Sequence, residues 1–331
     1  MFLKDQKKIA LLDGDQTVTY QELLQNISSL ATTYRLNKGD RAVIFFENSP
    51  LWVYAFYSVW SNRGINVPVD CSLKADELAY IIDDCTPTIL LCTAKERAVA
   101  ETACANVSSP PRIILLDETA GIKRVALSDT GEKTAPESMD DTAVIMYTSG
   151  TTGKPKGVML SYDNLLASIE GVRNLGMITS SDSIIALLPF YHIFPLQGSV
   201  LAPLSIGSQV VFIRNLNKDE IFATLQKHRV TMFLGVPRLY KLFHDGIMAK
   251  VKASPFAYAL FIVARLIFNL KLSRLLFGRI HRAFGGQIHS YLIGGAKLEP
   301  EIARNLWALG FLLVEGYGKT ETAPLITFNP G

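Results

Sequence analysis

The sequence predicts an α/β protein built from layered, largely parallel sheets that are flanked by helices. Short apolar runs of strand length recur along the whole chain, and amphipathic stretches with helical spacing lie between several of them. This alternation is typical of parallel strands joined by helical crossovers. Ligands of such sheets bind beyond the carboxyl ends of the strands, where the connecting loops gather.

The elements can be assigned from these apolar runs. The expected strands are 42–46, 65–68, 88–92, 112–116, 143–146, 183–188, 209–213, 231–234, 289–293 and 311–314. The expected amphipathic helices are 75–84, 218–227, 237–248 and 299–309. The run 51–60 predicts a buried helix, because Ser49-Pro50 precedes it and Gly64 follows it. It is too short for a membrane span, which needs about 18 apolar residues.

Composition narrows the class of protein. The chain has 331 residues, of which 49% are hydrophobic, so it can bury a sizeable core. A net charge of +3 does not indicate a nucleic-acid partner. The first ten residues contain lysines, but no apolar run follows them, so we expect no secretory signal. A cytoplasmic location is the expectation. The cysteines form no Cys-x-x-Cys pair, which favours reduced thiols over a zinc site or disulfides; they are Cys71, Cys85, Cys92 and Cys104.

A loop rich in glycine, hydroxyl groups and lysine follows the expected strand 143–146. Gly150, Gly153 and Gly157 let the backbone turn closely, and Lys154 and Lys156 supply positive charge. Its hydroxyls come from Thr148, Ser149, Thr151 and Thr152. The backbone N–H groups of such a turn can form an anion-binding nest. A solvated surface turn is the alternative, but this combination after a buried strand favours a phosphate site.

This loop differs from the common nucleotide-binding P-loop. Two residues separate Gly150 from Gly153, whereas the P-loop has four between its glycines. Pro155 follows Lys154, which also argues against a helix that starts at this point.

Three further loops carry candidate residues. In 188–194, His192 follows Phe190 and Tyr191, a setting in which a histidine is often only a packed core residue. The turn at Gly294-Gly295-Ala296 either simply joins a strand to a helix or lets the backbone approach a planar base. In 315–322, glycines on both sides of Tyr317 leave its ring free to stack on a base. Thr320 offers a hydroxyl to a phosphate, and Glu321 offers a hard oxygen to Mg²⁺.

The loop 147–158 resembles the signature phosphate loop of the adenylate-forming (AMP-binding) superfamily, which includes acyl-CoA synthetases, peptide-synthetase adenylation domains and luciferases. Segments 17–23, 67–70 and 77–81 are similar to further motifs of that family in its order. The resemblance implies its N-terminal domain, with two layered sheets. It would divide into a subdomain of about 56–183, which carries the phosphate loop, and a second of about 1–55 with 184–331.

The resemblance also implies roles for individual residues. Lys156 and the loop 148–154 would bind the phosphates of ATP, and Thr148 with Glu321 would hold Mg²⁺. Tyr317 would stack on adenine and Thr320 would contact the α-phosphate. His192 would orient the substrate carboxylate in a pocket shaped by Tyr191 and Phe190. The remaining residues expected around adenine and the acyl group are Gly294, Gly295, Ala296, Glu315, Gly316 and Gly318.

The implied reaction is attack of a carboxylate on the α-phosphorus of ATP, followed by transfer of the acyl group to a thiol. The thiol would belong to coenzyme A or to the phosphopantetheine of an acyl carrier protein. In the family, an Asp-bearing loop, a hinge and a small domain with a catalytic lysine follow the second motif. We therefore expect residues 1–331 to be a truncated N-terminal domain that is inactive alone.

The stretch 250–286 differs from the rest in composition. No acidic residue lies between Asp245 and Glu299, and aromatic and aliphatic residues alternate with basic ones at near-helical spacing. The basic residues are Lys250, Lys252, Arg265, Lys271, Arg274, Arg279, Arg282 and Lys297. Two interpretations remain open: a basic amphipathic surface at the inner face of a membrane, or a helix pair packed on the core with a solvated basic face.

The segment Val236–Tyr240 followed by this insertion looks most like the long-chain fatty acyl-CoA synthetases. A fatty acid is therefore the expected substrate and coenzyme A the expected acceptor. An acyl-carrier-protein ligase remains an alternative, and a non-catalytic nucleotide- or lipid-binding module is the alternative of a different class. 

Overall fold

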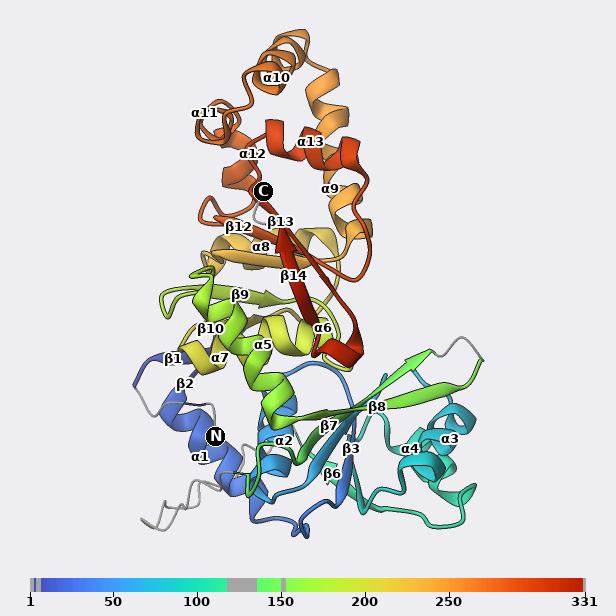
Figure 1. The fold of residues 1–331 in the computed structure, drawn as a ribbon. Coiled ribbons are helices and arrows are strands. Elements are labelled where there is room, and N and C mark those ends of the chain that lie inside the picture. The colour runs from blue at the N-terminus through green and yellow to red at the C-terminus, as the bar shows by residue number, and fades with distance from the viewer. Residues whose placement is uncertain (1–2, 4–6, 118–135, 150–152, 330–331) are drawn as a thin grey trace.

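The computed structural model describes residues 3, 7–117, 136–149 and 153–329, and two sheets dominate this part of the chain (Figure 1). The eight-stranded sheet has the order β14-β13-β12-β11-β9-β10-β1-β2, and the six-stranded sheet has the order β6-β5-β3-β4-β7-β8. Antiparallel pairs occur at β1–β2, β13–β14 and β7–β8, and the other described pairs are parallel. The predicted α/β class is confirmed.

Each expected strand is present. The eight-stranded sheet contains β1 (Ile9–Asp13), β2 (Gln16–Thr19), β9 (Ser183–Ala186), β10 (Gln209–Phe212), β11 (Met232–Gly235), β12 (Ser290–Ile293), β13 (Leu313–Gly318) and β14 (Leu325–Asn329). The six-stranded sheet contains β3 (Arg41–Phe45), β4 (Ile65–Pro68), β5 (Ile89–Thr93), β6 (Arg112–Leu116), β7 (Thr142–Ser149) and β8 (Pro155–Ser161). Strands β3 and β4 pair in parallel within this sheet. The division into subdomains stays a prediction.

The helices cover both faces of the sheets. They are α1 (Tyr20–Ala31), α2 (Pro50–Ser61), α3 (Ala75–Cys85), α4 (Arg97–Ala105), α5 (Tyr162–Asn174), α6 (Ile193–Pro195), α7 (Ala202–Ile206), α8 (Lys218–Lys227), α9 (Pro237–Lys252), α10 (Pro255–Ile267), α11 (Leu270–Leu276), α12 (Gly278–Ala283) and α13 (Pro300–Ala308). A π-helix, η1 (Leu196–Leu201), and a 3₁₀ turn, η2 (Thr320–Thr322), complete them. The sequence did not predict β1, β2, β8, β14, α1, α4 or α5.

Helix α2 forms the centre of the core between the two sheets. Leu51 through Trp60 are all buried, and they pack with residues of both sheets. The helix starts as expected, because the Ser49 hydroxyl accepts a hydrogen bond from the Trp52 N–H and Pro50 needs no partner in the first turn. The Trp60 indole donates to the Ala143 carbonyl at 2.8 Å, which links α2 to β7. A helix apolar on all sides is stable only when it is enclosed in this way.

The four thiols are free, as expected. Cys85, Cys92 and Cys104 are buried and Cys71 is partly buried. Burial raises the pKa of Cys92 to about 12, so its thiol stays protonated at neutral pH. No described helix combines the length and the apolar character needed to cross a membrane.

A buried carboxylate joins the amino ends of β9, β11 and β12. Asp182 is 5% exposed. One of its oxygens accepts hydrogen bonds from the Thr231 hydroxyl and from His289 Nε2, both at 2.8 Å. The other accepts from the N–H and hydroxyl of Thr179, also at 2.8 Å. Burial alone would raise the pKa of Asp182, but these hydrogen bonds outweigh it and hold the pKa well below its ordinary value.

We expect Asp182→Asn to lower the free energy of unfolding at pH 7 by about 2 kcal/mol, because an amide places a donor against groups that already donate. A depressed pKa stabilises the fold above the ordinary value of about 3.9, and this contribution is lost as the pH falls toward the folded value. The difference between parent and variant should therefore shrink below about pH 4. Urea unfolding across pH 3–7 measures it, with the exposed Asp83→Asn as control. An unchanged difference at every pH would contradict the assignment.

Candidate functional site

The loops that the sequence singled out in the second half of the chain meet at one edge of the eight-stranded sheet. Strands β9, β11, β12 and β13 are parallel neighbours, so their carboxyl ends lie side by side. The loop with Tyr191 and His192 follows β9, the turn at Gly294 follows β12, and Tyr317 lies near the end of β13. This is the edge at which α/β sheets bind ligands.

The lysine-rich loop comes from the other sheet, at the tip of the β7–β8 hairpin. In its register, Thr148 lies opposite Lys156 and Ser149 opposite Pro155. Directly opposed residues share a face of a hairpin, so Thr148 and Lys156 lie next to each other. The predicted residues Gly150, Thr151 and Thr152 lie outside the described residues. Gly153 has a φ of 85°, which suits glycine.

Helix α3 holds the base of this tip in place. The Tyr80 hydroxyl donates to the Pro155 carbonyl at 3.1 Å, and Lys154 Nζ lies 5.8 Å from the centre of the Tyr80 ring. The Tyr147 hydroxyl donates to the Asp84 carboxylate at the other end of the helix. Burial, followed by this carboxylate, raises the pKa of Tyr147 far above its ordinary value. The hairpin is therefore fixed by hydrogen bonds from two tyrosine hydroxyls, while the Lys156 side chain remains exposed.

The turn η2 places Thr320 and Glu321 beside that hairpin. The Thr322 hydroxyl accepts from the Lys319 N–H at 3.0 Å and lies 2.9 Å from the Pro324 carbonyl oxygen. Ala323 is buried in the core between the sheets, which anchors the turn. Strand β8 contacts η2, so the strand that carries Lys156 meets the turn that carries Glu321 (Figure 1). Glu321 is exposed, as is Tyr317, whose exposed fraction is 60%.

Two glycines permit the close backbone packing around Tyr317. A Cβ atom on Gly318 would lie 1.5 Å from the carbonyl oxygen of Pro324, and one on Gly316 would lie 3.1 Å from the Phe328 ring. Glu315 and Gly316 pair with β14 on the side away from β12. The Tyr317 ring is therefore exposed, as predicted, while the backbone on both sides of it is tightly packed.

The loop with His192 is held by a residue that the sequence analysis missed. The Asn48 side chain donates to the Leu188 carbonyl at 2.8 Å and accepts from the Phe190 N–H at 3.1 Å. Phe190 is fully buried, and its ring centre lies 5.0 Å from that of Trp52. Phe190 is thus a core anchor, whereas Tyr191 and His192 lie outside the core. Asn48 lies shortly after the end of β3, just as the other candidate residues lie after the ends of their strands. This position in the sequence could have identified Asn48 as a candidate.

Asp70 lies beside the aromatic pair. Burial and a hydrogen bond to Asp70 raise the pKa of Tyr191 to about 12. The ring centres of Tyr191 and His192 are 4.5 Å apart. Partial burial lowers the pKa of His192, although the Asp70 charge opposes this. Hence at neutral pH His192 is a neutral imidazole with one N–H to donate.

The turn after β12 exposes its backbone next to this loop. A Cβ atom on Gly294 would lie 2.7 Å from the Phe194 ring, so glycine is needed there. Gly295 has a φ of 82°, and both Gly295 and Ala296 are exposed. Gly294 therefore packs against the segment that follows His192, while its two successors remain accessible to a ligand.

The oxygen donors Thr148 and Glu321 could hold Mg²⁺ only if phosphate oxygens of a substrate supplied further ligands. Among the described residues no group of three or more His, Cys, Asp or Glu side chains could enclose a metal ion. A threonine hydroxyl and a carboxylate are hard oxygen donors, and Mg²⁺ typically combines one or two carboxylates with substrate phosphates. Thr148 and Glu321 fit that pattern. Their roles, and those of the other site residues, stay predictions.

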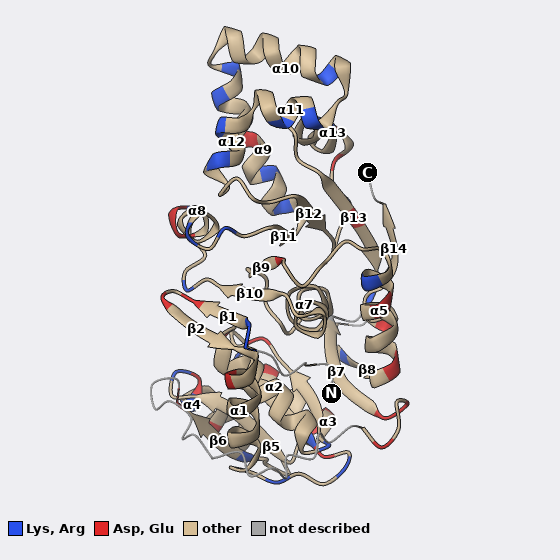
Figure 2. Cartoon of the chain, turned by 90° about the vertical axis from the view of Figure 1, so that its left-hand side faces the viewer, with Lys and Arg blue, Asp and Glu red and all other residues tan. Residues whose placement is uncertain are grey.

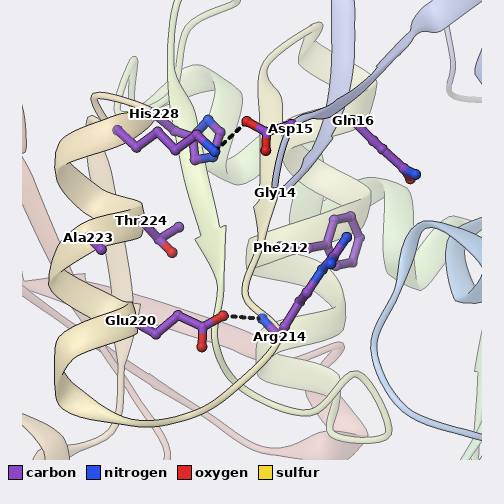
Figure 3. Close-up of a pocket in the computed structure, with 10 residues that line it drawn as sticks. Gly14, Asp15, Gln16, Phe212, Arg214, Glu220, Ala223, Thr224 and His228 are labelled. Carbon is purple, nitrogen blue, oxygen red and sulfur yellow. Dashed lines mark hydrogen bonds and ion pairs between the residues drawn. The ribbon is translucent and has the colours of Figure 1, made fainter.

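A separate cavity of ≈ 410 Å³ lies between β1–β2, the end of β10 and α8, away from these loops (Figure 3). Its charged side chains are satisfied by neighbouring groups. Lys227 Nζ lies 2.7 Å from Asp15, and the Glu220 carboxylate accepts from the backbone N–H of Arg214 at 3.3 Å. Arg214 also pairs with Asp13 at 3.2 Å. We interpret this cavity as a structural ion-pair network.

Known proteins share both the sequence pattern and the fold. A family model described as AMP-binding enzyme matches residues 3–331. A long chain acyl-CoA synthetase of Arabidopsis thaliana, described as peroxisomal, is 30% identical over 87% of this chain, which spans 45% of that relative's length. ATP-bound MatB of Rhodopseudomonas palustris has a TM-score of 0.76 at 26% identity, covering 99% of this chain and 60% of that one. The inhibitor-bound N-terminal domain of FACL13 from Mycobacterium tuberculosis has a TM-score of 0.77 at 21% identity, covering 97% and 74%.

We expect Gly318→Ala to abolish adenine-nucleotide binding, because the new methyl group would overlap the Pro324 carbonyl and displace Tyr317 and η2. Isothermal titration with ATP measures binding, and circular dichroism checks that the sheets persist. Gly171→Ala is the matched control, since a Cβ atom there in α5 would meet no atom within 4 Å. Wild-type affinity in Gly318→Ala would show that this turn does not contribute to the site.

Proposed function

The chain belongs to the AMP-binding enzyme family, and from this membership we propose that it activates a carboxylic acid with ATP, as the acyl-adenylate, and passes the acyl group to coenzyme A. The observation that carries the proposal is the contact between β8 and η2, since β8 is the strand that contains Lys156 and η2 is the turn that contains Thr320 and Glu321. A polyphosphate needs such a convergence of cationic, hydroxyl and metal-binding groups.

The proposed division of labour follows from charge. The carboxylate and the triphosphate repel each other, and Lys156 with the backbone N–H groups of the hairpin tip would offset that repulsion. Thr148 and Glu321 would hold Mg²⁺, which supplies further neutralisation of the phosphates. No general base is needed, because a carboxylic acid is ionised at neutral pH. His192, as a neutral donor, would orient the attacking carboxylate without adding a second charge.

We infer that the acid is a fatty acid of medium or long chain. Support comes from the Arabidopsis relative, which is a long chain acyl-CoA synthetase. An amino-acid substrate would need a buried counter-charge for its ammonium group. Asp70 is the acidic group beside Tyr191, but it already accepts hydrogen bonds from the N–H and hydroxyl of Ser72 at 2.8 and 2.7 Å, as well as from Tyr191. Its acceptor capacity is largely occupied.

Adenylation at full rate is expected to need the lysine that the family carries in its second domain. We therefore propose that residues 1–331 alone bind ATP or AMP weakly and turn over slowly. Activity is best measured on the protein expressed from its complete gene, and nucleotide binding on the 331-residue chain. Acyl-CoA formation at ordinary enzyme rates by residues 1–331 alone would contradict this part of the proposal.

We predict that Lys156→Ala and Glu321→Gln each lower kcat/KM for acyl-CoA formation by about 10²–10³-fold, the usual effect of losing one group that stabilises developing charge. Pyrophosphate exchange with acids from two carbons upward measures adenylation and chain-length preference together. Lys218→Ala and Glu170→Gln are the matched controls, since both side chains are exposed on other helices. A melting temperature close to the parent's would exclude unfolding as the cause.

Three outcomes would contradict the proposed function. Near-parent activity in Glu321→Gln would remove its assigned role. A maximum of kcat/KM at acetate or at an amino acid would exclude a fatty acid. Transfer to a carrier-protein phosphopantetheine but not to coenzyme A would indicate a carrier-protein ligase.

A further inference from the structure

Helices α10 and α11 present an unusually apolar surface at the end of the molecule farthest from the six-stranded sheet (Figure 1). Phe256 and Leu266 of α10 are 79% and 80% exposed, and Leu275 of α11 is 78% exposed. The other apolar side chains of this surface with at least 36% exposure are Tyr258, Ile262, Val263, Ile267, Phe268, Leu272 and Leu276. Single exposed apolar residues are normal, but a cluster in two consecutive helices indicates a surface that is covered in use.

The position of α10 on the protein is well defined. Its inner face buries Phe261 and Ala264 against the core of this end of the molecule. Arg265 pairs with Glu301 of α13 at 2.9 Å, and the Phe268 ring stacks on Trp307 with ring centres 3.8 Å apart. The apolar outer face is therefore held outward by specific contacts on the inner one.

The surroundings of this surface are basic. No acidic residue lies between Asp245 and Glu299. Within the described chain, no acidic side chain forms an ion pair with any of the exposed cations Lys250, Lys252, Lys271, Arg279 and Arg282. Lys and Arg are spread over α9, α11 and α12, next to the almost uncharged α10 (Figure 2). Exposed apolar groups bordered by unpaired cations match the chemistry of an anionic lipid surface.

We propose that the outer face of α10 and α11 docks on an anionic lipid bilayer. Phe256, Leu266 and Leu275 enter the acyl-chain boundary, while Lys250, Lys252 and Lys271 contact lipid phosphates. The helices lie in the plane of the interface, since α10 has 13 residues and is too short to span a bilayer. A second copy of the chain fits this face less well, because it would bring the same unpaired positive charge against it.

Vesicle flotation with the whole chain tests the proposal without any enzyme activity. We expect binding to vesicles of phosphatidylcholine with phosphatidylglycerol, weak binding to phosphatidylcholine alone, and loss of binding at high salt. The double variant Phe256→Ser, Leu266→Ser should lower the partition coefficient roughly 100-fold or more, because Phe→Ser removes six apolar side-chain carbons and Leu→Ser removes three. The matched control Leu175→Ser, Leu216→Ser removes side chains that are 56% and 69% exposed elsewhere, and should bind like the parent.

A charge variant separates electrostatic from apolar binding. Lys250→Gln, Lys252→Gln should lower partitioning roughly 30-fold, about fivefold for each lysine, whereas Lys74→Gln, Lys218→Gln should leave it unchanged. Equal binding to neutral and anionic vesicles, or parent-like binding by either α9–α10 variant, would overturn the proposal. A third result would also overturn it. If the parent is an oligomer that does not bind vesicles, and Phe256→Ser, Leu266→Ser converts it to a monomer, then this face is a contact between copies of the chain.

Discussion

The enclosure of helix α2 between the two sheets is the constraint on which the rest of the structure depends. The helix is apolar on every side, so it can be stable only if both sheets cover it. Trp60 connects it to β7 through the Ala143 carbonyl, and Trp52 packs on Phe190 at the start of the His192 loop. One helix therefore sets the distance between the hairpin of one sheet and the loops of the other.

Contacts with this core fix the positions of the site loops. The side chains expected to face a ligand contribute little to the geometry of these loops. Asn48 fixes the backbone at Leu188 and Phe190, Tyr80 fixes Pro155, and buried Ala323 fixes η2. The side chains expected to contact ligand are exposed: Lys156, Tyr317 and Glu321. This separation between buried positioning groups and exposed reacting groups is what a preformed binding site requires.

The sequence predicted the fold class, every central strand and the loops that meet at the sheet edge, because each of these depends on local apolar periodicity. It missed β8 because the apolar run there is only three residues long, Val158 to Leu160, and pairing with β7 is what makes this segment a strand. It missed the contacts of Asn48 with the His192 loop and of Asp70 with Tyr191, because the residues involved lie more than 100 positions apart in sequence. It treated Phe190 as part of the pocket, whereas its ring belongs to the core. The tip residues 150–152 lie outside the described part, so their predicted contacts stay predictions.

The contact between β8 and η2 has a consequence for stability as well as chemistry. A ligand held by both would bind only when the two sheets are docked, so its binding free energy would add to the free energy that keeps them together. By mass action, ligand at 100 times its dissociation constant would stabilise the docked arrangement by about 2.7 kcal/mol. Nucleotide would then act as a reversible cross-link between the halves of the molecule, and its cellular concentration would set how tightly they are joined.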